Sequence, residues 1–475
     1  MNGLIRGVGL RDAVAVNVIT MIGIGPLITI PLVLGYMNGP LALVGWIAGA
    51  IVALCDGLVW AELASRFPGS GGTYVYLRET FGPQTWGRAL AFLFNWQFLL
   101  YAPLILASGY IGFANYAGYF FPALAASAHL KQLLEIGLGL VTIALLYRRI
   151  TTIAAESFYL GLAAIVTLLL IIAAALPHAD LRRALAMDHP FSFSLGFLAG
   201  LGGSLFITLY DYVGYAQAAL LGDEVREANR TIPRAIVISI VVVAILYITL
   251  QVGVLGVVPW QELVGKNGGP APDSAQYVAA TVVERTWGPL AARIVTVFIL
   301  VTAFASLFGN LLGFSRIPYA AARDRAFLPM FAKLHPSGHF PYVSLLVIGG
   351  LSLAATFFTL DQVIAMLTAG IVLIQSIAQI AALIVLRVRR SPAPFRMWLF
   401  PVPAIIAAAG WLLAFTYSGP RAILYGAGWL ALGIVAYLAV AHRQRTWPFL
   451  RMVVAALAAL WAASLPAQAA PSGWM

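Results

Sequence analysis

Charged side chains are scarce in this sequence. Asp, Glu, Lys and Arg together make up 9% of its 475 residues, whereas apolar residues make up 61%. Soluble domains carry about 25% charged residues, so this composition excludes an ordinary water-soluble domain and indicates a membrane protein. The single cysteine, Cys55, has no second cysteine with which to form an internal disulfide, and a disulfide-bonded scaffold is therefore excluded.

Catalytic and metal-binding motifs are also lacking. The six histidines are scattered, and the sequence contains no His-Glu-x-x-His zinc pattern, no phosphate-binding loop and no nucleophile elbow. These absences disfavour an intramembrane enzyme. We expect a protein that performs no covalent chemistry and uses no cofactor or metal.

Long apolar runs account for most of the chain. A helix needs about 20 apolar residues to cross a bilayer. Twelve runs, separated by charged, proline or glycine clusters, lie near residues 13–37, 40–64, 86–113, 131–147, 152–176, 195–221, 234–258, 286–314, 341–360, 362–386, 398–417 and 421–441. The sequence therefore predicts twelve spans, preceded by a polar segment at residues 1–12 and followed by a tail at 442–475. Within the tail, the apolar stretch 452–465 is short for a span, and we expect an interfacial or protein-packed helix there.

The basic residues indicate the orientation of these spans. Lys and Arg number 28 against 17 Asp and Glu. If residues 1–12 are cytoplasmic, 21 of the 28 cations fall on the cytoplasmic side and 7 on the other. The positive-inside rule then predicts a multi-pass protein of the cytoplasmic (inner) membrane with a cytoplasmic N-terminus. The positive charge is thus interpreted as a record of topology, and nucleic acid is not an expected partner.

The first span is interrupted at mid-membrane depth. Two glycines and a proline occur in Gly23-Ile24-Gly25-Pro26, where a continuous helix is not expected. Pro26 suits the first turn of a new half-helix, because its missing N–H would be unpaired there in any case. The N–H groups of Ile24 and Gly25 would then face a cavity at the positive end of that half-helix, an arrangement that binds a carboxylate.

A second interruption is predicted five spans later. The glycines of residues 200–203 are followed by Tyr210-Asp211-Tyr212-Val213-Gly214-Tyr215, in which Asp211 is the only acid. An acid inside a span is costly and usually faces a cavity or a partner. Breaks at corresponding positions of two five-span halves are typical of an inverted-repeat transporter whose substrate site lies at the midplane.

Four segments resemble, in order, those of the amino acid–polyamine–organocation permeases. They are the break in span one and the stretches 62–76, 222–234 and 315–329, which follow spans two, six and eight. The resemblance covers roughly residues 10–440. It implies an all-α, five-plus-five inverted-repeat transporter fold, with repeats at residues 13–176 and 195–386 and two additional helices at 398–441. It also implies alternating access and an amino acid or amine substrate.

The resemblance further implies a set of substrate contacts. The substrate carboxylate would meet the N–H groups of Ile24 and Gly25, and the amino group would meet carbonyls of Met21, Tyr210 and Val213. Tyr210 falls where relatives place a bulky gate. The other predicted contacts lie at the two breaks and on spans three and six: Gly23, Asp211, Tyr212, Gly214, Phe206, Asn95 and Tyr101. Asn310 and Gln375 are weaker candidates for the cavity wall.

The remaining acids and the coupling mode leave alternatives open. Asp211 has three possible roles: contact with a cationic side chain or amine, transfer of a coupling proton, or a structural cap on unwound backbone. Asp56 and Glu62 of span two are interpreted as structural, with Glu62 near Arg66. No lysine lies in span five, where some relatives carry one in place of sodium, and sodium coupling is disfavoured. Proton symport and exchange both stay open.

The predicted function is secondary transport of an amino acid. A polyamine or other organic-amine carrier is the alternative if Asp211 contacts the substrate, and a substrate sensor of the same fold that does not transport is another. The expected partners are the small-molecule substrate, a coupled proton and the lipid bilayer. Backbone contacts recognise groups shared by all amino acids, so the sequence does not select one substrate.

Overall fold

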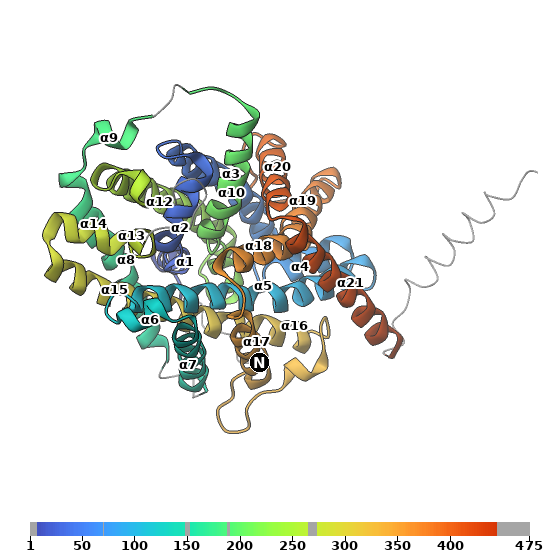
Figure 1. The fold of residues 1–475 in the computed structure, drawn as a ribbon. Coiled ribbons are helices and arrows are strands. Elements are labelled where there is room, and N and C mark those ends of the chain that lie inside the picture. The colour runs from blue at the N-terminus through green and yellow to red at the C-terminus, as the bar shows by residue number, and fades with distance from the viewer. Residues whose placement is uncertain (1–6, 70, 148–152, 188–190, 265–272, 444–475) are drawn as a thin grey trace, which may run out of the picture.

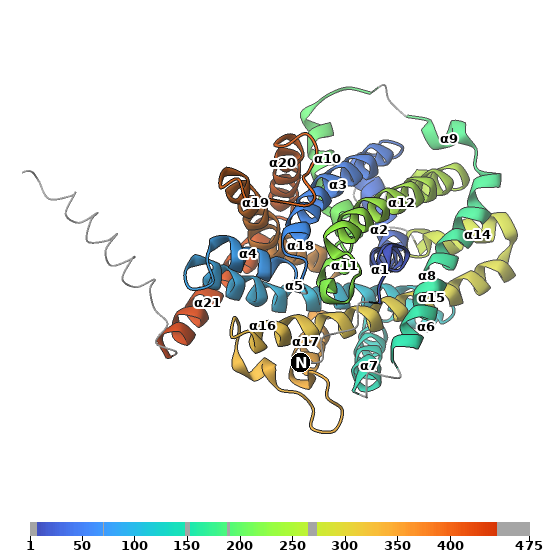
Figure 2. The same ribbon diagram turned by 180° about the vertical axis from the view of Figure 1, so that it is seen from behind.

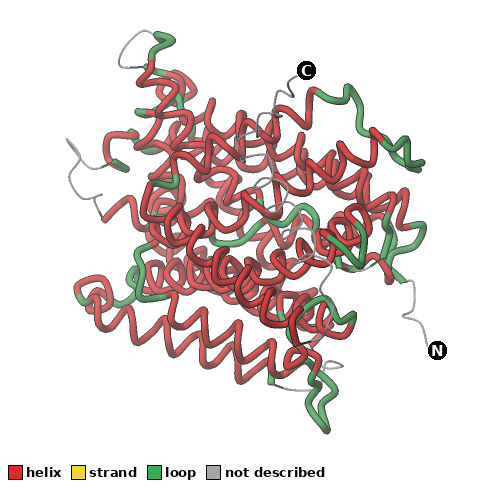
Figure 3. Tube along the Cα trace, turned by 90° about the vertical axis from the view of Figure 1, so that its right-hand side faces the viewer, coloured by secondary structure: helices red, strands yellow, loops and turns green. Residues whose placement is uncertain are grey.

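The chain is helical throughout the part that the structure describes. The computed structural model describes residues 7–69, 71–147, 153–187, 191–264 and 273–443, and within these ranges the regular elements are helices without a strand (Figure 1 and Figure 3). Eight described helices are long and apolar enough to cross a membrane, one bent pair forms a further span, and three shorter apolar helices accompany them. The predicted all-α polytopic membrane fold is confirmed.

The helices follow the predicted spans in order. Spans one to five are α1 (Leu10–Met21) with α2 (Gly25–Met37), α3 (Ala42–Arg66), α5 (Trp86–Ala117), α7 (Ala128–Leu146) and α8 (Ile153–Ala175). Spans six to ten are α10 (Leu195–Tyr212) with α11 (Gln217–Leu220), α12 (Ala228–Val257), α15 (Pro289–Phe314), α17 (Tyr342–Ala355), and α18 (Leu360–Ile371) with the π-helical turn η7 (Val372–Ile377) and α19 (Ala378–Val388). Spans eleven and twelve are α20 (Val402–Tyr417) and α21 (Pro420–Arg443).

Short helices connect these spans. They are α4 (Thr73–Phe81), α6 (Pro122–Ala126), η2 (Leu176–His178), α9 (Leu181–Leu185), η3 (Gly222–Glu224), η4 (Trp260–Glu262), α13 (Asp273–Gln276), α14 (Val278–Trp287), α16 (Arg316–Arg323) and η6 (Pro329–Ala332). The boundaries of the two repeats stay a prediction. The apolar segment 452–465 lies outside the described residues.

The predicted break in span one is present between α1 and α2. Helix α1 ends at Met21, α2 begins at Gly25, and the two axes meet at 55°. Pro26 occupies the first turn of α2, as its missing N–H favours. The break therefore exposes the N-terminal N–H groups of α2, which have no partner one turn earlier in the same helix.

The break in span six is shorter than predicted. Helix α10 runs without interruption through residues 200–203 and ends only at Tyr212, so the expected break at those glycines is wrong. The glycines serve close packing instead, since a Cβ on Gly200 would approach the backbone oxygen of Tyr36 to 2.5 Å. The actual break follows Tyr212, where Gly214 has a φ of +123° and lies against the backbone of Thr20 and Met21. Only glycine meets both demands.

The two broken helices lie next to each other among α3 and α12. Both ribbon views place α2 beside α10; α3 packs against α10 and α12, and α1 packs against α12 and α11 (Figure 1 and Figure 2). An aromatic cluster joins three of these helices, because Trp46 of α3 contacts both Tyr212 of α10 and Tyr247 of α12 edge to face. The Trp46 indole also donates a hydrogen bond to Gln251 over 3.0 Å. These buried contacts hold the ends of the broken helices in place.

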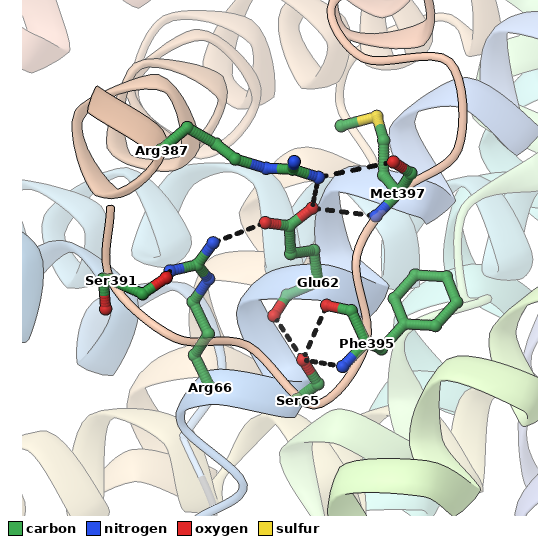
Figure 4. Close-up of polar contacts among 7 residues, drawn as sticks. All are labelled: Glu62, Ser65, Arg66, Arg387, Ser391, Phe395 and Met397. Atoms are coloured by element: carbon green, nitrogen blue, oxygen red, sulfur yellow. Dashed lines mark hydrogen bonds and ion pairs between the residues drawn. The ribbon is translucent and has the colours of Figure 1, made fainter. Parts of the chain in front are cut away.

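A buried ion-pair cluster fixes the C-terminal end of α3. The carboxylate of Glu62 accepts hydrogen bonds from Arg66 and Arg387, each over 2.5 Å, and from the backbone N–H of Met397 over 2.9 Å (Figure 4). Arg66 in turn donates to the carbonyl of Ser391 over 2.7 Å. The predicted proximity of Glu62 and Arg66 is confirmed. The cluster ties span two to the end of α19 and to the loop before α20.

Candidate substrate site

A cavity of about 130 Å³ lies where the two broken helices meet. Residues of both breaks contribute to its wall, together with faces of α5 and α15 and single residues of α3, α16, α18, η7 and α20. The predicted site between the two interruptions therefore coincides with a real opening in the protein.

Nine of the twelve predicted contact residues line this cavity. They are Met21, Gly23, Ile24, Gly25, Tyr101, Tyr210, Asp211, Val213 and Gly214. The weaker candidates Asn310 and Gln375 also line it. The structure thus brings together residues nearly 200 positions apart in the sequence, while their contact with a substrate stays a prediction.

Tyr212, Asn95 and Phe206 are not among the lining residues. Tyr212 follows Tyr210 by two positions and so points from the opposite side of α10, where it packs against Trp46 and Tyr247. Asn95 is fully buried and donates to the carbonyl of Ala91 within its own helix. Phe206 is buried in the apolar core one turn before Tyr210.

The cavity face of α5 could have been found from helical spacing. Its lining residues are Phe94, Phe98, Tyr101, Ile105, Ser108 and Gly109, most of which recur at intervals of three or four. The sequence prediction chose Asn95 for its polarity, although it lies one residue off this face. Ser108, Gln217 and Trp411 were not among the predicted contacts, and Trp411 comes from span eleven, outside both predicted repeats.

Asp211 lies against the start of α2. A methyl group added at Gly25 would sit 2.5 Å from Asp211 Oδ1, and Thr29 Oγ1 donates to Asp211 Oδ2 over 2.6 Å. The positive end of the α2 dipole favours a carboxylate at this position. Among the described residues, Asp211 forms no ion pair and its Oδ1 has no hydrogen-bond partner.

Tyrosine hydroxyl groups satisfy carbonyls at the first break and within α2. Tyr247 of α12 donates to the carbonyl of Met21 at the end of α1 over 2.8 Å. Tyr116 of α5 donates over 3.1 Å to the carbonyl of Leu27, which lacks its helical donor because Pro31 has no N–H. A carbonyl oxygen has two lone pairs. The Met21 carbonyl also accepts the N–H of Gly23 over 3.0 Å, so both of its lone pairs are already in use.

Neutral polar side chains also line the cavity. Tyr210 and Ser108 share a hydrogen bond of 2.7 Å, Tyr101 donates to Gln375 Oε1 over 2.6 Å, and Asn310 Nδ2 donates to Ser306 over 3.2 Å. Asp211 is the only charged residue among those that line the cavity in the described part of the chain. The cavity therefore offers backbone groups at the breaks together with uncharged hydrogen-bonding side chains.

Comparison with known proteins identifies the family to which this chain belongs. The model of the amino acid permease family matches residues 8–457. This chain belongs to the amino acid permease family. The permease therefore has the inverted-repeat architecture that fits this family, as the resemblance to amino acid–polyamine–organocation permeases implied, and its relatives are transporters rather than enzymes.

Curated relatives extend over most of the permease. A serine/threonine exchanger of Bacillus subtilis is 27% identical over 426 residues, which cover 86% of this chain and 90% of the exchanger. The human cystine/glutamate transporter is 26% identical, with 85% of this chain and 78% of the transporter covered. Cationic amino acid transporter 4 of mouse is 28% identical, with 81% and 60% covered. The permease is therefore similar to amino acid transporters whose named substrates differ in charge.

Proposed function

We propose that this permease moves neutral amino acids across the cytoplasmic membrane by alternating access, coupled to protons or to exchange. The observation that carries the proposal is the cavity between the two broken helices. On one side, the N–H groups at the start of α2 suit a carboxylate. The carbonyls in the break after α10 suit an amino group. These two sets of groups are complementary to the part that all amino acids share.

Because the side chains that line the cavity are uncharged except for Asp211, we expect the substrate to have a neutral side chain. A charged side chain buried in this cavity would need an opposite charge, because an unpaired buried ion is costly. Asp211 is the only charged lining residue in the described chain, and Thr29 of α2 already donates to its carboxylate. The serine/threonine exchanger is the relative whose named substrates share this neutral, polar character.

Alternating access would use the two predicted repeats as its moving parts. We place residues 1–12 in the cytoplasm and assign 13–176 and 195–386 to the repeats, with helices eleven and twelve outside them. The excess of Lys and Arg on one side of the spans supports this orientation.

The proposal is tested by counterflow in proteoliposomes loaded with unlabelled L-serine. We expect labelled L-serine or L-threonine to accumulate transiently, and L-arginine, L-glutamate and putrescine to compete poorly. A protein that binds these amino acids, as thermal shift measures, but shows no counterflow with any of them would be a sensor. That result would overturn the transport proposal.

A polyamine or organic-amine carrier is the second candidate, favoured by the unpartnered Oδ1 of Asp211. An ammonium group in the cavity would form a charge-assisted hydrogen bond with this oxygen. We propose instead that Asp211 has a structural role beside α2, because Thr29 already donates to its carboxylate and the positive end of the α2 dipole lies beside it. In the Asp211→Asn variant we expect amino acid counterflow to weaken without a change in the order of preferred substrates. Selective loss of putrescine or L-arginine uptake would support the amine carrier.

A further inference from the structure

A second buried acid lies beside the cavity, on α3. Asp56 is 2% exposed, and its Oδ2 accepts a hydrogen bond from the hydroxyl of Tyr215, which lies in the break of span six. Its Oδ1 has no hydrogen-bond partner, and none of the ion pairs in the described part of the chain includes Asp56. Asp56 is thus a buried carboxyl group that is only partly satisfied.

Three aromatic side chains connect Asp56 to the cavity. Tyr215, Trp60 of α3 and Trp411 of α20 all line the cavity, and all three lie near the Asp56 carboxyl. The Tyr215 hydroxyl donates to Asp56, whereas the buried indole nitrogen of Trp411 has no hydrogen-bond partner among the described residues. Wall residues from three different parts of the chain therefore surround a single acid.

The other surroundings of Asp56 are uncharged. Cys55, its neighbour on α3, and Tyr215 are the titratable groups that interact with it. Helix α12 faces this stretch of α3 with Ile240, which lies against Gly57, and α20 faces it with Trp411. No Lys or Arg of the described chain forms an ion pair that would balance a negative charge on Asp56.

The charge state of such a carboxyl group changes what it can bind. A carboxylate only accepts hydrogen bonds and can hold several donors, whereas a neutral carboxyl group donates one of its own. An ionised carboxylate without a cation is costly in an apolar environment, and so acids inside spans commonly mark proton pathways. Gain or loss of a proton at Asp56 would therefore rearrange the donors of Tyr215, Trp60 and Trp411, and with them the cavity wall.

We propose that Asp56 binds and releases the coupling proton of this permease, and that Tyr215 relays it from the cavity. The relay is a concerted transfer. The Tyr215 hydroxyl hydrogen moves to the Asp56 carboxylate while a hydronium ion in the cavity gives a proton to the Tyr215 oxygen. The phenol stays neutral, the carboxylate becomes a carboxyl group, and the hydronium becomes water. This proposal rests on the proposed transport function and selects proton symport within it.

The test separates transport from proton coupling in proteoliposomes. Labelled L-serine is measured first as counterflow at equal pH, and then as uptake driven by a gradient of one pH unit, alkaline inside. One unit corresponds to about 1.4 kcal/mol per proton, so one coupled proton supports about tenfold accumulation. We expect this accumulation in the wild type. In Asp56→Asn we expect measurable counterflow without a response to the gradient.

Glu135→Gln is the matched control, because Glu135 is another buried acid inside a span, on α7, and does not line the cavity. It should accumulate L-serine like the wild type. Tyr215→Phe keeps the acid but removes the relay, and we expect its gradient-driven uptake to slow while counterflow persists. It also serves as the test if Asp56→Asn does not fold.

Several outcomes would overturn the proposal. Gradient-driven accumulation in Asp56→Asn equal to that of Glu135→Gln would show that the proton binds elsewhere. Loss of the gradient response in Asp211→Asn but not in Asp56→Asn would assign it to the other acid. Counterflow by the wild type with no response to the gradient would identify a proton-independent exchanger. Absence of counterflow with every amino acid would instead refute the transport function itself.

Discussion

Neutralising Glu62 should destabilise the permease far more than neutralising an exposed glutamate. Glu62 is fully buried and bridges Arg66 and Arg387, whose side chains are 2% and 18% exposed (Figure 4). The Glu62→Gln substitution keeps the shape of the side chain. However, it removes the negative charge and places an NH₂ donor against a guanidinium that can only donate. The two buried arginines then keep only neutral partners, the carbonyls of Ser391 and Met397, and have no counter-ion.

The expected cost follows from this burial. Breaking a buried ion pair by removing one partner costs about 3–5 kcal/mol, because the remaining charge is uncompensated. Unfolding entropy is about 2.1 cal/mol/K per residue, or roughly 1 kcal/mol/K for a chain of this length. The melting temperature of Glu62→Gln should therefore fall by about 3–5 °C. Adding Arg387→Met should restore part of the loss, since an apolar replacement removes the unpaired charge.

Thermal unfolding of the detergent-solubilised protein measures this effect, and Glu79→Gln supplies the control. Glu79 pairs with Arg78 at a distance of 2.8 Å, but the two side chains are 36% and 24% exposed. Exposed pairs contribute only about 0–1 kcal/mol. Equal melting temperatures for Glu62→Gln and Glu79→Gln would refute the reasoning. A double variant no more stable than Glu62→Gln would show that the stranded guanidinium is not the cause of the loss.

Two further predictions concern the first break. Gly25→Ala places a methyl group 2.5 Å from Asp211 Oδ1. Such overpacking costs about 1–3 kcal/mol. If this cost falls on the substrate-binding state, L-serine uptake should decrease roughly 10–100-fold. Gly309→Ala, at a glycine with open space around it, should transport normally, and similar uptake by the two variants would contradict this account. Tyr247→Phe removes the donor to the Met21 carbonyl. It should cost about 1–3 kcal/mol, seen as a lower melting temperature and weaker L-serine binding; unchanged values for both would exclude that role.

Local chemistry allowed much of the first break to be predicted. A glycine-rich turn followed by Pro26 cannot continue a helix, and α2 begins beside that proline as expected. The glycines at residues 200–203 gave a similar signal, yet α10 continues through them. Glycine permits both a break and a close helix contact, and only the presence of Tyr36 against these residues decides between the two.

The wall of the cavity was predicted in part. Residues at the breaks were found because unwound backbone in a membrane must face protein or a cavity. Tyr212 and Asn95 were chosen from their position or polarity, but the rotation of α10 and α5 turns them away from the lining. Trp411 could not be found in this way, because nothing in span eleven indicates that it reaches a site formed by spans one and six.

The sequence by itself determined the membrane environment, the order of the spans in the described part of the chain and the break at Pro26, because hydropathy and backbone chemistry act over short stretches of chain. Tertiary structure decided how the buried acids are used. Asp56 and Asp211 are both acids within apolar runs, and their surroundings come from distant segments: Tyr215 and Trp411 for the first, and Thr29 and the start of α2 for the second. The energy of a buried charge depends on those neighbours, and only folding brings them together.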